Sequence, residues 1–430
     1  MKGTRKMKPE IKQRIEQIKA GQVPEGYKLT RAGIMPYDWC CDREYRAKDI
    51  FKSITNKKHN GEFDVLSATQ DKGVIPREQV DINIKYNKDS VAGYKKVDKG
   101  DFVISLRSFQ GGIEYSEYEG LVSPAYTVLK PIIPICDEYY KYYFKTSDYI
   151  NRLNIGTYGI RDGKQIGYED FGDMVIHYPP LAEQEKIAKI LSTQDRIIEL
   201  YQRKIEELQK MKKIYLSKMF PKKGENVPEW RFSQFNDSWE QRKLGDNIIE
   251  YTEATTKNNQ YPPLTSSRKG IFLQTEYFAG NQIASDDNTG YNIVPYGYFT
   301  YRHMSDDDIF HFNINDVVEN GIVSTLYPVF TTDENLDSRY LQYQLNYGYE
   351  FAKFAILQKQ GGSRTYMYLN KLKQLYLTMP KSVEEQKAIS AFFMSLDDLI
   401  TLHQRKLEET KKYKKALMQL LLTGIVRCKW

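Results

Sequence analysis

Residues 183–220 read EQEKIAKILSTQDRIIELYQRKIEELQKMKKIYLSKMF, and residues 385–422 read EQKAISAFFMSLDDLITLHQRKLEETKKYKKALMQLLL. The two stretches align without a gap at an offset of 202 positions, and neither contains glycine or proline. Apolar side chains recur in both at spacings of mostly three and four, which places them on one face of a helix. The sequence therefore predicts two long amphipathic helices that are copies of each other.

Helix-stopping residues bound both predicted helices. Pro180 and Pro221 flank the first, whereas Pro380 precedes the second and Gly424 follows it. About 36 residues at ~1.5 Å each make a rod of roughly 55 Å. Such a rod with one broad apolar stripe needs a partner, and the sister helix is the obvious one. Domains at opposite ends would require the pair to be antiparallel.

The apolar stripe supplies the residues expected at the helix-pair and subunit interface. His403 lies on this stripe, and we expect it to be a packed residue opposite Tyr201 rather than a ligand or catalyst. Ser382 and Glu385 have the spacing of a capping box at the start of the second helix. An alternative stays open, in which each helix packs only on its own domain. The predicted interface residues are Ile187, Ile190, Leu191, Ile198, Tyr201, Ile205, Leu208, Ile389, Phe392, Phe393, Leu396, Ile400, His403 and Leu407.

The internal repeat extends beyond the helices. Trp39 and Trp239 lie 200 positions apart, and the sequence Gly-Leu-Val-Ser at 120–123 recurs as Gly-Ile-Val-Ser at 321–324. The order of elements is therefore domain, helix, domain, helix. A duplicated chain of this kind is expected to fold with approximate two-fold symmetry, because each copy can offer the same surface to the other.

The predicted organisation has five parts. Residues 1–35 form a basic lead segment with a short helix, 36–178 the first domain, 179–223 the first long helix, 224–378 the second domain, and 379–430 the second long helix. Short β-type runs broken by Gly, Asn and Asp alternate with shorter helical stretches inside the domains. The predicted fold class is α+β, with two mixed α/β domains in a pseudo-two-fold arrangement, separated by a long antiparallel coiled-coil helix pair.

Several loops of both domains combine Arg or Lys with Gly, Ser, Thr, Asn or Gln and an aromatic residue. Arg and Lys bind guanine or phosphate, amide side chains bind adenine, and Gly allows close backbone approach. A single loop of this kind is more often solvated surface. The candidate DNA-binding residues are Lys72, Arg107, Ser108, Gln110, Tyr158, Arg161, Lys164, Arg268, Lys269, Arg302, Gln360, Ser363, Arg364 and Tyr366.

Composition narrows the class of protein. A net charge of +7 permits a polyanionic partner without requiring one. No run of about 18 apolar residues is present, and no apolar stretch follows the basic N-terminus, so we expect a cytoplasmic protein. The four cysteines match neither a zinc site nor a disulfide framework, so we expect reduced structural thiols and no bound metal.

Motifs for chemistry are missing from the sequence. We find no phosphate-binding GxxxxGK[ST] loop, no HExxH, and no Asn/Asp-Pro-Pro-aromatic tetrapeptide of amino-methyltransferases. His177, His303 and His311 have no counterparts in the other copy, so a duplicated histidine-based triad is excluded. We therefore expect no catalytic residue and no enzymatic activity in this chain.

The chain resembles the specificity subunits of type I restriction–modification enzymes. The resemblance rests on PPLAEQEKI at 179–187 and SVEEQKAI at 382–389, each followed by a long helix, and on the tryptophan before each domain. It implies two target recognition domains that each read one half of a bipartite DNA site, with the helix pair as a spacer.

The resemblance also implies partners and cofactors. Two methyltransferase subunits would dock on the helices and bring S-adenosylmethionine, and two motor–nuclease subunits would use ATP and Mg²⁺. Two other classes of protein stay open: an adaptor whose domains bind no DNA, and a stand-alone nuclease.

Overall fold

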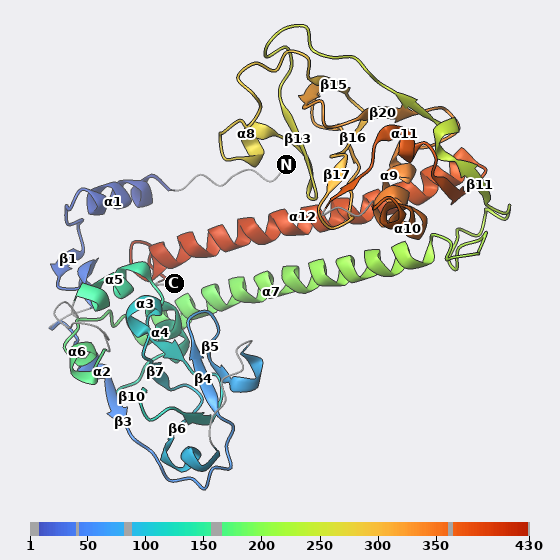
Figure 1. The fold of residues 1–430 in the computed structure, drawn as a ribbon. Coiled ribbons are helices and arrows are strands. Elements are labelled where there is room, and N and C mark those ends of the chain that lie inside the picture. The colour runs from blue at the N-terminus through green and yellow to red at the C-terminus, as the bar shows by residue number, and fades with distance from the viewer. Residues whose placement is uncertain (1–7, 40–42, 81–87, 156–165, 360–363, 429–430) are drawn as a thin grey trace. The chain divides into compact units, whose positions relative to one another are not determined.

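The computed structural model describes residues 8–39, 43–80, 88–155, 166–359 and 364–428 (Figure 1). The chain forms two compact units. Unit 1 contains residues 1–202 together with 406–430, and unit 2 contains residues 203–405. Each unit therefore holds one of the predicted domains and one end of each long helix.

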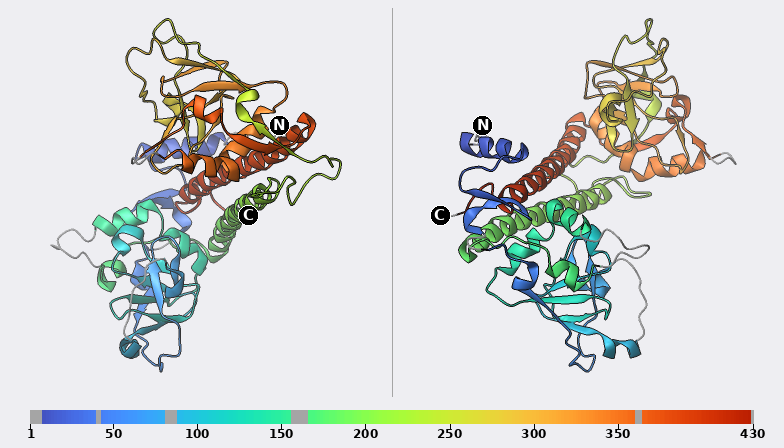
Figure 2. Two further views of the ribbon diagram at one scale, coloured as in Figure 1. Left: turned by 45° about the vertical axis from the view of Figure 1, so that its right-hand side comes forward. Right: turned by 90° about the vertical axis from the view of Figure 1, so that its left-hand side faces the viewer.

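The two predicted long helices are present. Helix α7 spans Leu181–Lys218 with 38 residues, and α12 spans Val383–Leu421 with 39. At ~1.5 Å per residue each is a rod of roughly 57 Å. The two further views in Figure 2 show each of them as one uninterrupted helix.

Only half of the predicted capping box at the start of α12 is formed. The Ser382 hydroxyl accepts a hydrogen bond from the Glu385 backbone N–H at 3.2 Å. The Glu385 carboxylate accepts from Arg231 at 2.6 and 2.7 Å and from Trp239 Nε1 at 3.1 Å. The charged donor draws this carboxylate away from the cap, so the glutamate joins the helix to its domain instead.

In unit 1 the two helices run antiparallel. Glu183, in the first turn of α7, accepts hydrogen bonds from Arg427, beyond the end of α12, at 2.9 and 2.7 Å. Asp195, farther along α7, pairs with Lys414, which lies earlier in α12. Contacts that advance along one helix and retreat along the other define an antiparallel pair.

Unit 2 repeats this arrangement with the roles of the helices exchanged. Lys212 of α7 donates to both carboxylate oxygens of Asp397 in α12, at 2.6 and 2.9 Å. Beyond the end of α7, Arg231 binds Glu385 in the first turn of α12. The antiparallel pairing of the helices is therefore confirmed within each unit.

Both units contain a four-stranded antiparallel sheet with the same strand order. The order is β3, β10, β7, β8 in unit 1 and β12, β20, β16, β18 in unit 2. This match confirms two copies of one α+β domain. The strands are β3 (Phe51–Ile54), β10 (Thr127–Pro131), β7 (Phe102–Ile104), β8 (Glu114–Tyr115), β12 (Ile248–Glu250), β20 (Val329–Thr332), β16 (Phe299–Thr300) and β18 (Asn313–Ile314).

Shorter elements complete the two units. In unit 1 they are α1 (Pro9–Lys19), β1 (Tyr27–Thr30), β2 (Gly33–Pro36), α2 (Ala47–Ile50), β4 (Leu66–Thr69), β5 (Gly73–Pro76), β6 (Lys95–Val97), α3 (Ser108–Gly111), β9 (Gly120–Val122), α4 (Asp137–Tyr143), α5 (Ser147–Ile155) and α6 (Tyr168–Gly172). In unit 2 they are β11 (Glu240–Lys243), β13 (Leu264–Ser267), β14 (Gly270–Leu273), α8 (Gln274–Tyr277), β15 (Asn292–Pro295), β17 (Met304–Ser305), β19 (Asn320–Val323), α9 (Ser338–Tyr347), α10 (Tyr349–Leu357), β21 (Thr365–Tyr366), α11 (Leu369–Leu372) and β22 (Tyr376–Met379).

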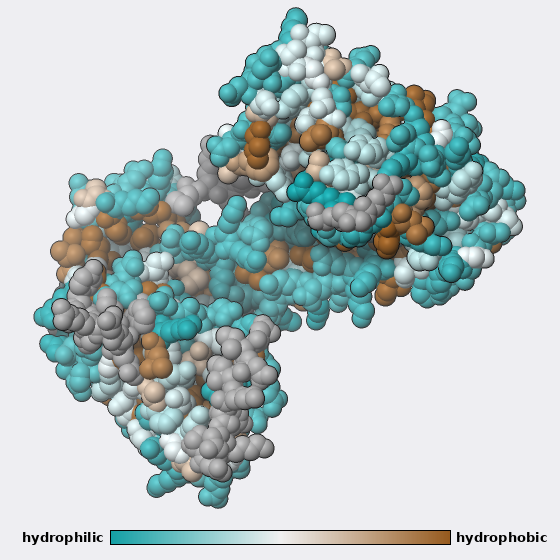
Figure 3. Space-filling model, in the orientation of Figure 1, coloured by the Kyte–Doolittle hydropathy of each residue, from teal (hydrophilic) through white to brown (hydrophobic). Residues whose placement is uncertain are grey.

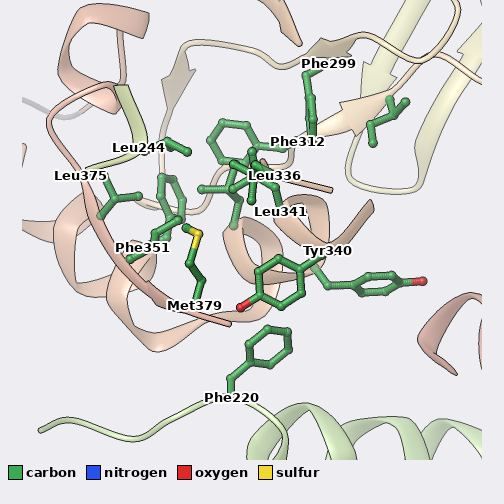
Figure 4. Packing of buried hydrophobic residues seen from close by; sticks show 14 of the residues in the cluster. Phe220, Leu244, Phe299, Phe312, Leu336, Tyr340, Leu341, Phe351, Leu375 and Met379 are labelled. Carbon is green, nitrogen blue, oxygen red and sulfur yellow. The ribbon is translucent and has the colours of Figure 1, made fainter. Parts of the chain in front are cut away.

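Aromatic side chains dominate both cores. In unit 1, Phe51 packs edge-on against Phe102 and Tyr140, with ring centroids 5.5 and 5.2 Å apart. In unit 2, Phe220 beyond the end of α7 packs with Tyr340 of α9 beside the strands of the domain (Figure 4). Burying one such ring contributes about 2–3 kcal/mol, so these clusters fix each domain on the long helices.

A buried glutamine, identical in both copies, joins each domain to its long helix. Gln184 accepts from the Cys136 backbone N–H at 2.9 Å and donates to the carbonyl of Pro179 at 2.7 Å. Gln386 does the same with the Asp337 N–H and with the proline carbonyl before its own helix. Both amides thus satisfy backbone groups at the start of a helix, which would otherwise be buried without partners.

The lead segment packs on the C-terminal segment of unit 1. Arg14 of α1 donates to the carbonyl of Ile425 at 2.6 Å, and the Tyr27 hydroxyl donates to the carbonyl of Gly424 at 2.7 Å. The short helix predicted in the lead segment is therefore confirmed.

Candidate nucleic-acid interface

A cavity of about 670 Å³ opens in unit 1 between the β4–β5 turn, α3, α4 and the long helices. Its lining holds the four lysines Lys72, Lys141, Lys145 and Lys414, amide side chains such as Gln110, and the carboxylates of Asp71, Glu117 and Asp195. A concave surface with several ammonium and amide groups suits a polyanion whose edges carry hydrogen-bonding groups.

The β4–β5 turn carries the first predicted reading residue. Thr69 shapes this turn, because its hydroxyl accepts from the Lys72 N–H at 3.1 Å and donates to the carbonyl of Gly73 at 2.9 Å. Gly73 has φ +74°, and a Cβ there would lie 2.7 Å from the carbonyl oxygen of Tyr115. Glycine is therefore required here, and the turn leaves Gln70 and Lys72 exposed.

Helix α3 and the loop before it, like the β4–β5 turn, carry exposed side chains that the sequence predicts to contact DNA, and each of the two is a candidate reading element of unit 1. Arg107 and Gln110, both predicted, are exposed on it. Ser108 is buried instead, and its hydroxyl accepts from the Ser105 backbone N–H at 2.8 Å. Ser108 therefore shapes the loop that presents the other two side chains.

Unit 2 presents the equivalent turn between β13 and β14. Arg268 and Lys269 are its two turn residues and both are exposed. They help to line a cavity of about 380 Å³ that also includes Lys212 and Arg339. Arg302 lines a neighbouring cavity of about 280 Å³ together with Arg268.

An acidic loop pairs with two of the three predicted arginines of unit 2. Arg268 binds both carboxylate oxygens of Asp307 at 2.6 Å, and Arg364 binds Asp306 at 2.7 Å. The Arg268 guanidinium, with the hydroxyl of Ser305, lowers the pKa of Asp307 to about 2. Exposed ion pairs of this kind contribute little to stability, so a phosphate or a base edge can compete for either arginine.

Tyr366 is part of a small aromatic stack beside Arg364. Its ring lies 6.0 Å from that of Tyr368, with the planes 12° apart, and Tyr368 stacks on His303 at 5.0 Å. The remaining predicted DNA-binding residues, Tyr158, Arg161, Lys164, Gln360 and Ser363, lie outside the described residues.

Sequence reasoning missed the lysines that line the unit 1 cavity from the helices. Lys414 and its counterpart Lys212 lie 202 positions apart, so the repeat contained the signal. The prediction followed only the apolar stripe of each helix and overlooked these cations. Lys141 and Lys145 lie in and after α4, away from any glycine-rich loop, and no comparable signal pointed to them.

Most predicted residues of the helix stripe are buried. Ile190, Ile198, Tyr201, Phe392 and His403 are half-buried. The exposed surface of both units is mostly hydrophilic on the face that Figure 3 shows. The fully buried members of the stripe are Ile187, Leu191, Ile205, Leu208, Ile389, Phe393, Leu396, Ile400 and Leu407.

Within the described ranges, no group of three or more His, Cys, Asp or Glu side chains is placed to hold a metal ion. Likewise, no helix among those residues is long and apolar enough to cross a membrane.

Comparison with known families identifies the chain. The sequence profile described as "Type I restriction modification DNA specificity domain" matches twice, over residues 43–210 and 236–412. These matches cover most of the chain, one in each repeat. The chain belongs to this family.

Relatives with curated descriptions extend over almost the full length. A putative type I restriction enzyme MjaX specificity subunit from Methanocaldococcus jannaschii is 28% identical and covers 94% of this chain and 97% of its own. The type I restriction enzyme MjaVIII specificity subunit of the same organism is 25% identical with the same coverage.

A solved structure shares the fold. The S subunit of a type I restriction–modification system from M. genitalium has a TM-score of 0.54 at 13% identity, covering 88% of this chain and 95% of its own. The expected family, the α+β fold and the role in DNA sequence specificity are thus confirmed. The family is one of non-catalytic specificity subunits, so the expectation that this chain is not an enzyme is confirmed as well.

Proposed function

We propose that this specificity subunit reads a bipartite DNA site, one half with each domain. The observation that carries the proposal is the repeated reading surface. Each domain presents a hairpin turn with Lys or Arg, at the β4–β5 turn or the β13–β14 turn, over a cavity that includes a lysine of the long helices.

Linked domains multiply specificity. A wrong base in either half costs about 1–3 kcal/mol. Once one domain has bound, the linked domain is present at a high effective concentration. The long helices, free of Gly and Pro, are stiff enough to hold the two half-sites at one spacing.

The proposal extends to the partners. Two methyltransferase subunits dock on the helix pair and supply S-adenosylmethionine for methylation of adenine N6. Two motor–nuclease subunits join that core and use ATP and Mg²⁺, and the whole assembly works in the cytoplasm. The two long helices also expose apolar residues such as Leu200 and Leu399, at 47% and 42%, which supports docking of a further protein there.

A genome-wide map of N6-methyladenine tests the proposal. Cells would express this chain with its methyltransferase subunit, and the control cells would lack only this chain. We expect one new split motif, with two short blocks around an unspecified gap. Normal expression and assembly without a new motif would reject bipartite reading and favour the adaptor.

A further inference from the structure

One lysine of unit 1 ties together both reading elements of its domain. The ammonium group of Lys145, in the turn after α4, donates to the carbonyl of Gln70 at 3.2 Å and to that of Gly111 at 2.8 Å. Its third contact is the Glu114 carboxylate at 2.6 Å. An ammonium group has three N–H donors, so the β4–β5 turn, α3 and β8 together use all of them.

The two reading elements approach each other closely at this point. A Cβ at Gly111 would lie 2.7 Å from Cγ of Gln70, so any larger residue would require that side chain to shift. The Gln70 side-chain amide also donates to Gln110 at 3.4 Å. The carbonyls that Lys145 binds thus belong to Gln70, whose exposed side chain lines the cavity, and to Gly111, the neighbour of the exposed Gln110.

The acid that holds Lys145 is costly for the fold. Glu114 is only 1% exposed, and among the described residues its Oε2 has no hydrogen-bond partner. Burial raises its pKa to about 7, against the opposing effect of Lys145, and Asp71 raises it further. A buried ion pair is often no more stabilising than an apolar replacement, so stability alone gives a poor account of this pair.

In unit 2 the equivalent β13–β14 turn is held by an uncharged side chain at the position that Glu114 has in unit 1. Asn313 occupies the position of Glu114. Glu114 is the first residue of β8 and pairs with Val103, the second residue of β7. Asn313 is likewise the first residue of β18 and pairs with Thr300, the second residue of β16. Its amide donates to the Ser266 hydroxyl at 2.8 Å and to the carbonyl of Ser267 at 2.9 Å.

The position of Lys145 is also filled by an amide in unit 2. Asn346, 201 residues after Lys145, accepts from the Phe312 N–H at 2.8 Å and donates to the Phe312 carbonyl at 2.9 Å. The same two positions thus connect to the strand and turn in both domains, with a charged pair in one and two amides in the other.

We propose that Lys145 is a positioning residue that fixes the distance between the two reading elements of the first domain and thereby sets its base specificity. In the second domain Asn313 holds the equivalent turn. This inference rests on the proposed reading of one half-site by each domain.

Methylation maps of variants test the inference in the complete chain with its methyltransferase subunit. Lys145→Met removes all three contacts and leaves a buried acid, so it also destabilises unit 1. The double variant Glu114→Gln, Lys145→Met removes the buried charge and is expected to recover most of that stability. The matched control is Lys48→Met, because Lys48 is a half-exposed lysine on α2 that pairs with Asp173 at 2.6 Å, away from both reading elements.

We expect Lys145→Met and the double variant to relax one half of the methylated motif, with discrimination against single wrong bases falling roughly tenfold. The other half of the motif stays sharp, which shows that the chain is folded and assembled. Asn313→Ala should relax the opposite half, whereas Lys48→Met should leave both halves sharp.

The outcomes separate two kinds of failure. A wild-type chain that directs no split motif rejects the proposed function itself. If the wild-type motif is present, an unchanged motif with the double variant overturns the positioning role. The positioning role is also overturned if the double variant regains both its stability and full discrimination against wrong bases, because Lys145 would then matter only for folding.

Discussion

At the scale of single residues, His177 shows how burial decides the chemistry of a side chain. Its ring lies between Trp39 and Tyr143, with centroids 5.5 and 5.0 Å away, and Nδ1 lies 2.9 Å from the carbonyl oxygen of Leu422. Burial lowers the pKa of His177 to about 4. The residue therefore stays neutral at physiological pH and serves in the core.

This histidine should make unit 1 sensitive to acid. The unfolded chain binds a proton at His177 near pH 6.5, but the folded chain binds it only near pH 4, so stability is lost as pH falls through that window. The loss is about 3 kcal/mol at the lower end. We expect His177→Gln to have a flatter dependence of unfolding free energy on pH, measured by urea titration.

Arg364 is a predicted DNA-binding residue whose ion pair the structure describes. Its ion pair with Asp306 is half-exposed, so Arg364→Ala should leave the melting temperature nearly unchanged. Loss of a base or phosphate contact should lower methylation of cognate DNA by roughly tenfold and affect one half-site only. Equal methylation kinetics would contradict the assignment, and Arg31→Ala, outside the reading elements, provides the control.

At the scale of secondary-structure elements, a repeated set of three side chains holds helix, sister helix and domain together. In unit 2, Asp397 of α12 accepts from Lys212 of α7 and from the Tyr343 hydroxyl at 2.7 Å. In unit 1, Asp195 of α7 accepts from Lys414 and from the Tyr142 hydroxyl at 2.7 Å. The periodic pattern predicted the helices, whereas these polar contacts fix their register.

Replacing either aspartate should loosen only its own unit. We expect Asp397→Ala to destabilise unit 2 by roughly 1 kcal/mol, a discounted value because the side chain is more than one third exposed. Hydrogen exchange should speed up around α9 and the start of α12, while unit 1 stays unchanged. Asp195→Ala should show the reverse pattern, and equal effects in both units would contradict this account.

At the scale of the whole molecule, unit 1 is not contiguous in the sequence. Residues 1–202 need residues 406–430 to complete their core, because Leu421 and Leu422 are buried with Ile187 and Leu191. The repeat provides a substitute. Met219 and Phe220 lie 202 positions before Leu421 and Leu422, and Lys212 lies equally far before Lys414.

A fragment ending at Lys223 should therefore pair with itself. Each copy would complete the other by offering residues 204–223 in place of 406–425. We expect a dimer in sedimentation experiments, and methylation of an interrupted palindrome with the methyltransferase subunit. A fragment ending at residue 200 lacks the replacement segment and should not dimerise. A strictly monomeric, methylation-incompetent fragment ending at Lys223 would contradict the prediction.

The sequence by itself determined the two long helices, the duplication and the family. Helices of this length can be predicted from the spacing of apolar residues over about ten turns. The repeat of 202 positions is visible because identical residues recur at that offset. Glycine, polar residues and a cation together also indicated the loops of Lys72, Arg107, Gln110 and Arg268, whose side chains are exposed, while their contacts with DNA stay predictions. The predicted domain limits stay predictions.

Only the tertiary structure decided which side chains meet across distant segments. Nothing in the sequence around Lys145 or Glu114 indicates that they touch, or that Lys145 reaches the backbone of Gln70, 75 positions away. Likewise, Ser108 looked like a reading residue and is buried, and Glu385 looked like half of a cap and binds Arg231. The physical reason is that local spacing dictates helices and turns, whereas burial and the pairing of charges depend on which surfaces the fold brings together.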